Sequence, residues 1–247
     1  MRTHLRAAKQ AILIWLFCAL YIPAMIVLLL VTLGQAKATL GCALVRGWGY
    51  ASSWLLGVKI AYTPAARAMM DRREARVLTF NHNSTLDLMV GATMMCQGSV
   101  VIAKKELLYL PLIGQVILLL DVVRLARTNR QGATDTLNAV AKRIVDGRHS
   151  VLISPEGTRS PDGKLGPFKL GPFHVAIAAQ VPIYPIVIRG CADLMPRDAR
   201  ACKPGTVTFD VLPAIPTAGL TATDVRPLAE RVRAAYLEAL GEVPAAG

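Results

Sequence analysis

The chain of 247 residues has few cysteines, few histidines and few acids. Its five cysteines include no CxxC pair, which argues against a disulfide framework and fits a reducing compartment. No cluster of histidine, cysteine or acidic residues has metal-ligand spacing, so we expect no metal. The sequence also lacks zinc-finger spacing, an aromatic RNA-binding run and a lysine-rich arm, and we therefore expect no nucleic acid partner.

Basic and apolar residues are abundant instead. Lysine and arginine number 28 against 16 acids, which gives a formal net charge of +12, and 53% of the residues are hydrophobic. A balance of this kind suits an anionic membrane surface or an anionic substrate. Because the basic residues are scattered through apolar sequence, we expect membrane phospholipids as partners.

An uncharged apolar stretch occupies residues 11–33. As a helix it would be about 34 Å long, enough to cross a hydrocarbon core, with Pro23 as a source of a kink. A signal peptide is the alternative, but its apolar core is usually only about 7–15 residues long. Residues 38–58 predict a second apolar helix, so residues 1–58 form a hydrophobic helical hairpin that anchors the chain. The hairpin either spans the membrane or dips into one leaflet.

Residues 59–247 have a different pattern, in which short β-like runs alternate with helical stretches. This alternation predicts one α/β domain with a mixed, mostly parallel sheet flanked by helices. The strands are predicted at residues 77–80, 100–103, 151–154, 185–189 and 206–212. The helices are predicted at residues 85–97, 112–120, 132–147, 171–180 and 223–240.

Polar motifs follow three of these strands. Asn81-His82 follows residues 77–80, Lys104-Lys105 follows residues 100–103, and Pro155-Glu156 ends the strand at 151–154. Ligand sites in parallel sheets lie beyond the carboxyl ends of the strands. We therefore expect the three motifs to converge on one site.

His82 and Asp87 are candidates for acid–base chemistry. Histidine changes its protonation state near neutral pH, and a carboxylate that binds one ring nitrogen orients the other toward a hydroxyl. The substrate would then supply the nucleophile. The alternative is structural, because Ser84 and Asp87 have the spacing of a helix capping box.

The run from Glu156 to Arg159 is suited to phosphate oxygens. Gly157 permits a sharp turn, Thr158 offers a hydroxyl, and Arg159 offers a planar guanidinium fork. Glu156 would orient Arg159 or meet a substrate hydroxyl. The alternative is an exposed turn with a solvated arginine.

Together these residues resemble the lysophosphatidic acid acyltransferase family, whose members share four sequence blocks in a fixed order. The first block, NHxSxxD, matches residues 81–87. The second matches Lys104 through Gly114 and closes with Arg127. The EGTRS block matches residues 156–160, and the last block matches Val181-Pro182-Ile183 with Pro185.

The resemblance implies the glycerolipid acyltransferase fold and transfer of an acyl chain from acyl-carrier protein or acyl-CoA to the sn-2 hydroxyl of lysophosphatidic acid, giving phosphatidic acid. It makes His82 the general base and Asp87 its orienting partner. Residues that bind the phosphate or shape the acceptor site would be Lys104, Arg127, Glu156, Gly157, Thr158 and Arg159. Supporting residues would be Asn81, Ser84, Lys105 and Pro182.

The resemblance further implies no cofactor beyond the thioester co-substrate, and a place at the cytoplasmic face of the bacterial inner membrane. Two alternatives remain. One is another acceptor, such as glycerol 3-phosphate or a lyso-ornithine lipid. The other is a membrane lipid-binding protein without catalysis, which the apolar anchor and the charge of +12 would also suit.

Overall fold

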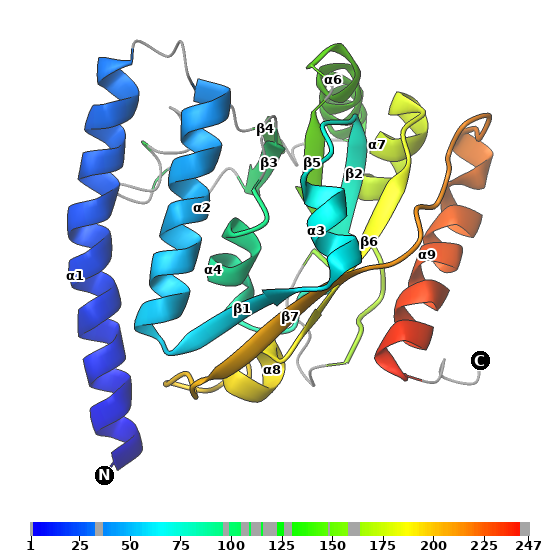
Figure 1. Ribbon diagram of the computed structural model, residues 1–247. Coiled ribbons are helices and arrows are strands. Elements are labelled where there is room, and N and C mark those ends of the chain that lie inside the picture. The colour runs from blue at the N-terminus through cyan, green and yellow to red at the C-terminus, as the bar shows by residue number, and fades with distance from the viewer. Residues whose placement is uncertain are drawn as a thin grey trace.

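The computed structural model shows a seven-stranded sheet with helices on both faces and a further helix outside them (Figure 1). It describes residues 2–32, 37–95, 99–104, 109, 115, 123–125, 130–147, 149–157 and 164–242. The strand order is β1-β7-β6-β2-β5-β3-β4. Every neighbouring pair is parallel except β6 with β7. The predicted α/β fold with a mixed, mostly parallel sheet is therefore confirmed.

The described strands and helices have the following bounds. The strands are β1 (Val58–Tyr62), β2 (Arg76–Phe80), β3 (Ser99–Lys104), β4 (Val123–Leu125), β5 (Ser150–Ile153), β6 (Ile183–Arg189) and β7 (Gly205–Val211). The helices are α1 (Arg2–Val31), α2 (Lys37–Leu55), α3 (Pro64–Met70), α4 (Asp87–Ala92), α6 (Arg130–Gly147), α7 (Gly171–Ala179), α8 (Cys191–Leu194), the 3₁₀ turn η2 (Ala222–Asp224) and α9 (Val225–Leu240).

The five predicted strands and four of the predicted helices are present, with shifted ends. The predicted helix at 112–120 lies almost wholly outside the described residues. The structure adds β1, β4, α3 and α8. The helix predicted at 85–97 is shorter, because α4 begins only at Asp87 and ends at Ala92.

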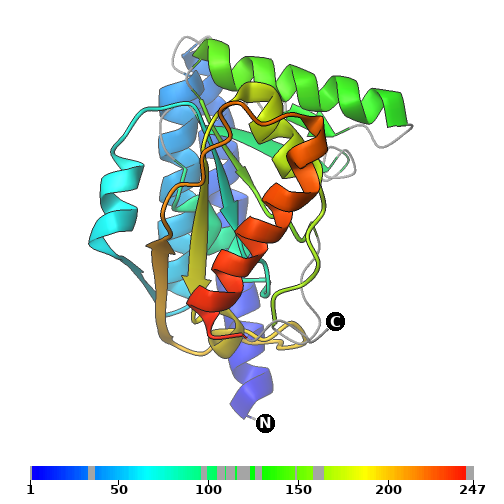
Figure 2. The same cartoon turned by 90° about the vertical axis from the view of Figure 1, so that its right-hand side faces the viewer.

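The central strands are apolar on both faces because helices cover both. Successive side chains of a strand point to opposite faces, and β2 shows this directly. Val77 belongs to the core that α6, α7 and α9 cover, whereas Leu78 belongs to the core that α3, α4 and the end of α2 cover. Figure 2 shows α6, α7 and α9 together on the first of these faces.

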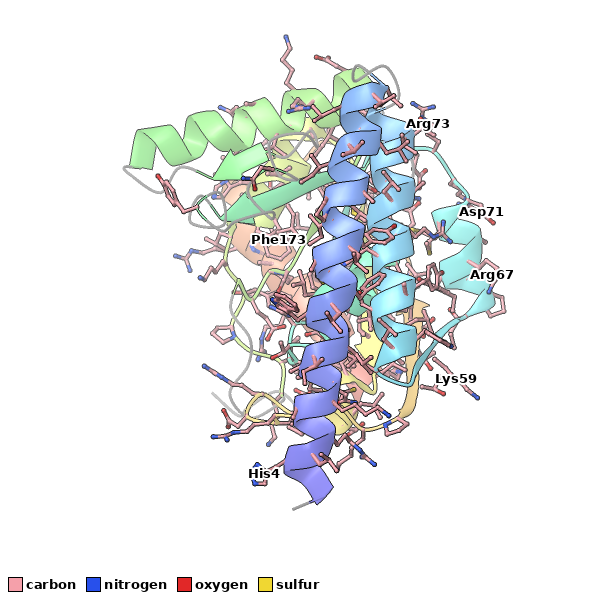
Figure 3. The ribbon with its side chains drawn as sticks, turned by 90° about the vertical axis from the view of Figure 1, so that its left-hand side faces the viewer. His4, Lys59, Arg67, Asp71, Arg73 and Phe173 are labelled. Carbon is pink, nitrogen blue, oxygen red and sulfur yellow. The ribbon has the colours of Figure 1, made fainter. Side chains whose placement is uncertain are left out.

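The predicted helical hairpin is also present: α1 and α2 lie side by side (Figure 3). The Tyr21 hydroxyl of α1 donates to the Leu44 carbonyl at 2.8 Å, and the Trp48 indole donates to Cys18 Sγ at 3.4 Å. Pro23 lies inside α1, which continues through it as one helix. Among the described helices, only α1 is long and apolar enough to cross a membrane, over His4–Val31.

The hairpin packs directly against the α/β domain. A Cβ atom at Gly49 of α2 would lie 2.7 Å from the Met89 carbonyl oxygen of α4, so this glycine permits the close approach of the two helices. Near the N-terminus of α1, the Gln10 side chain exchanges two hydrogen bonds with the backbone of Cys202, both of 2.9 Å. The predicted boundary between residues 58 and 59 falls inside β1, and the division into two domains stays a prediction.

Candidate active site

His82 and Asp87 form a hydrogen-bonded pair just beyond the carboxyl end of β2. Nδ1 of His82 lies 2.8 Å from Oδ2 of Asp87. The aspartate side chain is fully buried, whereas that of the histidine is 27% exposed. Within the described residues no group bonds to Nε2 of the ring, which leaves this nitrogen available to a substrate hydroxyl.

Asp87 also orders the loop that carries His82. The same Oδ2 accepts the backbone N–H groups of Asn83 and Ser84, each at 2.8 Å. The bond from Ser84 is half of the predicted capping box, while the residue before α4, Leu86, makes no side-chain cap. One carboxylate therefore both shapes the loop and holds the imidazole, and the catalytic role of the pair stays a prediction.

Glu156 joins the His82 loop to the segment after β5. Its Oε1 accepts the His82 backbone N–H at 2.7 Å, and its Oε2 accepts the Gly166 N–H at 2.8 Å. The residue is only 4% exposed. Burial raises the pKa of the Glu156 carboxyl, and the two N–H donors partly offset this. Glu156 therefore positions the backbone of His82.

Asn81 and Ser84 fix the two sides of the same loop. The Asn81 amide donates to the Ile188 carbonyl at 2.9 Å and accepts the Ile188 N–H at 2.7 Å, which extends the β2–β6 pairing past the strand end. The Ser84 hydroxyl donates to the Met195 carbonyl at 2.6 Å, after α8. Two of the four predicted supporting residues, Asn81 and Ser84, thus lie at the His82 loop.

Gly157 forms the turn after β5 with a φ of +65°, in the left-handed region that favours glycine. A Cβ atom here would lie 2.9 Å from Cδ of Lys169 and 3.0 Å from its Nζ. The turn thus brings an exposed lysine over the Glu156-Gly157 backbone. The sequence signal for Lys169 is its place between Phe168 and the Gly-Pro that opens α7.

The other predicted phosphate ligands are only partly visible. Lys104 ends β3, which pairs parallel with β5 next to β2, so its backbone lies at the same edge of the sheet as His82. The Lys104 side chain lies outside the described part of the chain, as do four predicted site residues: Lys105, Arg127, Thr158 and Arg159.

Pro182 lies at the opposite end of the sheet. Its carbonyl accepts the Val77 N–H at 3.0 Å, near the start of β2. His82 follows Val77 by five residues, or about 16 Å along an extended strand. The structure therefore does not bring Pro182 to the pair of His82 and Asp87.

Several residues around the pair had no clear sequence signal. Cys191 opens α8 and is 1% exposed. Burial and then the neighbouring Asp87 charge raise the pKa of its thiol, which therefore stays neutral behind the carboxylate. Cys191, Gly166 and Met195 are all remote from His82 in sequence and reach it only through the sheet order. Among the described residues no cluster of three potential metal ligands occurs, and the expected absence of metal and cofactor stays a prediction.

Both the sequence and the fold of this chain are similar to those of known proteins. The model of the family described as Acyltransferase matches residues 64–189. Human 1-acyl-sn-glycerol-3-phosphate acyltransferase beta is 34% identical over 229 residues, which cover 91% of this chain and 81% of the human protein. The human alpha enzyme is 37% identical over 171 residues, which cover 69% of this chain and 60% of that protein.

A solved structure shows the same fold. It is the crystal structure of the 1-acyl-sn-glycerophosphate (LPA) acyltransferase PlsC from Thermotoga maritima, with a TM-score of 0.77. The match covers 100% of both chains at 20% sequence identity.

Proposed function

The chain belongs to the acyltransferase family that includes the 1-acyl-sn-glycerol-3-phosphate acyltransferases, and from that premise we propose that it acylates the sn-2 hydroxyl of lysophosphatidic acid to give phosphatidic acid. The resemblance carried by the four sequence blocks is confirmed at the level of the family, and the chain is an acyltransferase. The acceptor is proposed from the names of the relatives, which are 1-acyl-sn-glycerol-3-phosphate acyltransferases.

The observation that supports the reaction most strongly is the hydrogen bond of 2.8 Å between His82 Nδ1 and Asp87 Oδ2. The ring is partly open to solvent. Nε2 takes the proton of the acceptor hydroxyl as the hydroxyl oxygen attacks the thioester carbonyl carbon. The C–O bond forms, the C–S bond breaks, and the imidazolium returns its proton to the thiolate of the leaving group. Asp87 stabilises the imidazolium between these two steps.

The acceptor phosphate would bind beside this pair. Lys104, Arg127, Thr158 and Arg159 are the proposed ligands, and Gly157 provides the turn that carries two of them. Lys169 adds a cation whose Nζ lies over Gly157. Glu156 would support this site indirectly, because both of its carboxylate oxygens are occupied by backbone N–H groups.

The co-substrate and setting are part of the same proposal. The donor is acyl-carrier protein or acyl-CoA, since either presents the required thioester, and no further cofactor takes part. The apolar helix α1 supports membrane association. The proposed place is the cytoplasmic face of the bacterial inner membrane.

The test is acyl transfer by the purified full chain in lipid, with a labelled acyl thioester and three acceptors in parallel: lysophosphatidic acid, glycerol 3-phosphate and lyso-ornithine lipid. We expect phosphatidic acid as the main product and a loss of about 10²–10⁴-fold in His82→Ala, the usual contribution of a general base. Arg159→Ala should impair the two phosphate-bearing acceptors more than the ornithine lipid.

Two results would contradict the proposal. Undiminished acylation by His82→Ala would remove this base from the mechanism. Transfer to no acceptor, by protein shown to be folded, would favour the non-catalytic lipid-binding alternative.

A further inference from the structure

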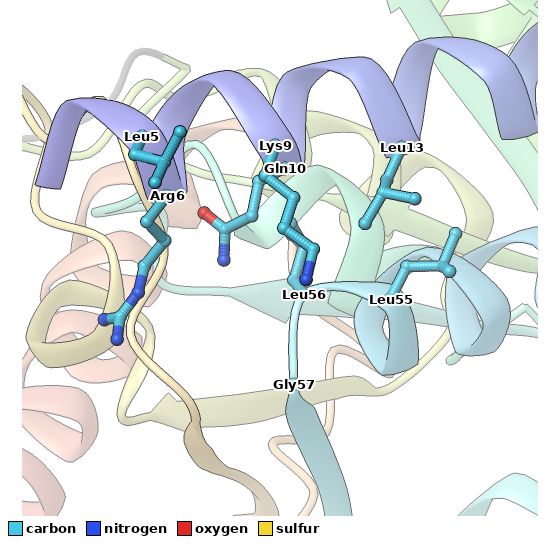
Figure 4. A pocket seen from close by; sticks show the side chains of 8 residues that line it. All are labelled: Leu5, Arg6, Lys9, Gln10, Leu13, Leu55, Leu56 and Gly57. Carbon is cyan, nitrogen blue, oxygen red and sulfur yellow. The ribbon is translucent and has the colours of Figure 1, made fainter. Parts of the chain in front are cut away.

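A pocket away from the catalytic pair lies between the first turns of α1 and the end of α2 (Figure 4). Its volume is about 460 Å³, within the range of pockets that hold small ligands. Arg6 and Lys9 extend into it from α1, and Gly57 closes it at the turn into β1. The proposed reaction uses none of these residues.

The lining is divided into a cationic part and an apolar part. Arg6 and Lys9 are three positions apart, so they share one face of the helix. The pocket lining includes no acid, and within the described part of the chain neither cation forms an ion pair. Leu13, Leu55 and Leu56 supply the apolar part. A ligand that fills both parts must carry an anion attached to hydrocarbon.

Two exposed tryptophans lie close in the sequence to residues that line this pocket. Trp15 is 69% exposed two residues after Leu13, and Trp54 is 76% exposed just before Leu55. Exposed tryptophans of apolar helices favour the membrane–water interface. Lys9 precedes Trp15 by about 9 Å of helix, which puts the two cations on the headgroup side of the tryptophans.

The rest of the outer face of α1 is apolar. Exposed large hydrophobic residues continue along it from Leu16 to Val31. A lipid-facing helix with this order of residues presents cations first, tryptophan next and hydrocarbon last. That order matches the phosphate, glycerol and acyl regions of one leaflet.

We propose that this pocket binds the phosphate headgroup of an anionic membrane phospholipid. Arg6 and Lys9 bind the phosphate, and Leu13 and Leu55 contact the first part of the acyl chains. A free phosphate would leave the apolar part of the pocket uncovered. The site is separate from the proposed acceptor site, so it does not depend on which lysolipid is acylated.

The pocket also borders the contact between α1 and the loop that follows α8. Gln10, which lines the pocket, holds the backbone of Cys202. The same loop supplies the Met195 carbonyl that accepts the Ser84 hydroxyl of the His82 loop. A lipid bound at Arg6 and Lys9 therefore stabilises α1 at the point where α1 meets the active-site loop.

The experiment measures quenching of tryptophan fluorescence by brominated lipids in the full chain, reconstituted in phosphatidylcholine vesicles. Trp48→Phe serves as the common background, so that Trp15 and Trp54 are the reporters. Brominated phosphatidylglycerol at a low fraction should quench more strongly than the same fraction of brominated phosphatidylcholine. Arg6→Gln with Lys9→Gln should remove this excess, with a loss of relative affinity of about fivefold for each neutralised cation.

The matched control is Arg67→Gln with Arg73→Gln, which removes the same charge from the α3 region. Figure 3 shows Arg73 at the opposite end of the hairpin from His4, and Arg67 beyond α2 from α1. This control should keep the excess quenching. Unchanged quenching by brominated phosphatidylcholine shows that the Arg6 and Lys9 variant is still inserted.

Three outcomes would overturn the proposal. Equal quenching by the two brominated lipids in the background protein would exclude anionic selectivity. An equal loss in both double variants would assign the effect to total charge. Displacement of the anionic lipid by inorganic phosphate would assign the site to a free anion.

Discussion

At the scale of single residues, the site is organised by two buried carboxylates with different tasks. Asp87 accepts three N–H groups on one oxygen, including the imidazole of His82. Glu156 accepts two backbone N–H groups, one on each oxygen. Asp87 thus holds the His82 ring and Glu156 holds its backbone, so the position of Nε2 is fixed from both sides.

The change Asp87→Asn should separate the contribution of ring orientation to activity from the contribution of the carboxylate charge. The amide keeps the size of the carboxylate but not its charge, so it no longer stabilises the imidazolium. We expect kcat to fall by about 10²–10⁴-fold with a much smaller change in KM. Asp193→Asn, at an exposed acid on α8, is the control and should leave kcat unchanged. Equal kcat values in the two variants would contradict the role of Asp87.

Glu156→Gln should alter stability in a pH-dependent way. Burial raises the pKa of Glu156 above its ordinary value of 4.5, so the folded protein holds this proton more tightly than the unfolded chain does. The free energy of unfolding of the unaltered protein, relative to the variant, should therefore fall as the pH rises above 4.5. The slope is at most about 1.4 kcal/mol per pH unit for one proton.

Chemical unfolding of both proteins in detergent across this pH range measures the difference. The variant also loses one of the two hydrogen bonds to the backbone, which costs about 1–3 kcal/mol at every pH. A difference between the two proteins that does not change with pH would show that burial does not act on Glu156 in this way.

The sequence predicts the pairing of His82 with Asp87 but not what surrounds the pair. His82 and Asp87 are five positions apart, so local spacing is enough to pair them. Glu156 is 74 positions from His82, and their contact exists only because β2 and β5 are neighbours in the sheet. The sequence therefore identifies the Glu156 motif, but it predicts the Arg159 guanidinium or a substrate hydroxyl as the partner of Glu156.

At the scale of elements, a side chain of α9 supplies a hydrogen-bond partner to the irregular strand β6. Pro185 lies inside β6, which is the strand between β2 and β7, and proline has no N–H to donate. The next N–H, of Ile186, donates to the hydroxyl of Tyr236 on α9 at 3.1 Å. The same hydroxyl lies 3.0 Å from Thr79 Oγ1 on β2. Tyr236 thus joins two central strands to α9.

Tyr236→Phe should therefore destabilise the fold. It leaves a buried N–H and a buried hydroxyl without their partner, which costs about 1–3 kcal/mol for each unsatisfied group. Tyr50→Phe is the matched control, since Tyr50 lies at the surface, and it should change the free energy of unfolding by less than about 0.5 kcal/mol. Denaturant unfolding in detergent compares them. Similar values for the two variants would show that the Tyr236 hydroxyl has no structural role.

The elements that sequence reasoning missed are short or lie at edges. β4 has three residues and β1 five, and both are edge strands, so neither has the continuous apolar run of a strand buried on both faces. β1 also follows directly after the predicted anchor. By contrast β2 and β6 lie in the centre of the sheet and most of their residues are buried, and their approximate positions were predicted correctly.

At the scale of the whole molecule, the N-terminal hairpin and the end of the sheet that carries His82 are physically joined. α1 forms an outer layer whose N-terminal part reaches the loop after α8 through Gln10 and Cys202. Its inner face is buried at Met25 and Leu29, while its outer face stays apolar and exposed. Sequence hydropathy predicts such a helix but cannot show which of its faces the protein covers.

A single acid on that outer face should therefore weaken membrane association. Leu20 lies near the middle of α1 and is 75% exposed, so Leu20→Asp would place a charge where lipid is expected. An acid at the centre of a membrane helix costs about 2.5–3.5 kcal/mol, which corresponds to a loss of roughly 100-fold in partition into vesicles. Flotation of the full chain with vesicles measures this partition.

The matched control for this prediction is Ala234→Asp, which adds the same charge to an exposed position of α9. Figure 1 shows α9 on the opposite side of the molecule from α1. The control should float with the vesicles as the unaltered protein does. Because Leu20 makes little contact with the rest of the fold, Leu20→Asp should keep its free energy of unfolding, and a loss of flotation then reports the membrane contact alone. Undiminished flotation of Leu20→Asp would show that lipid does not cover this face of α1.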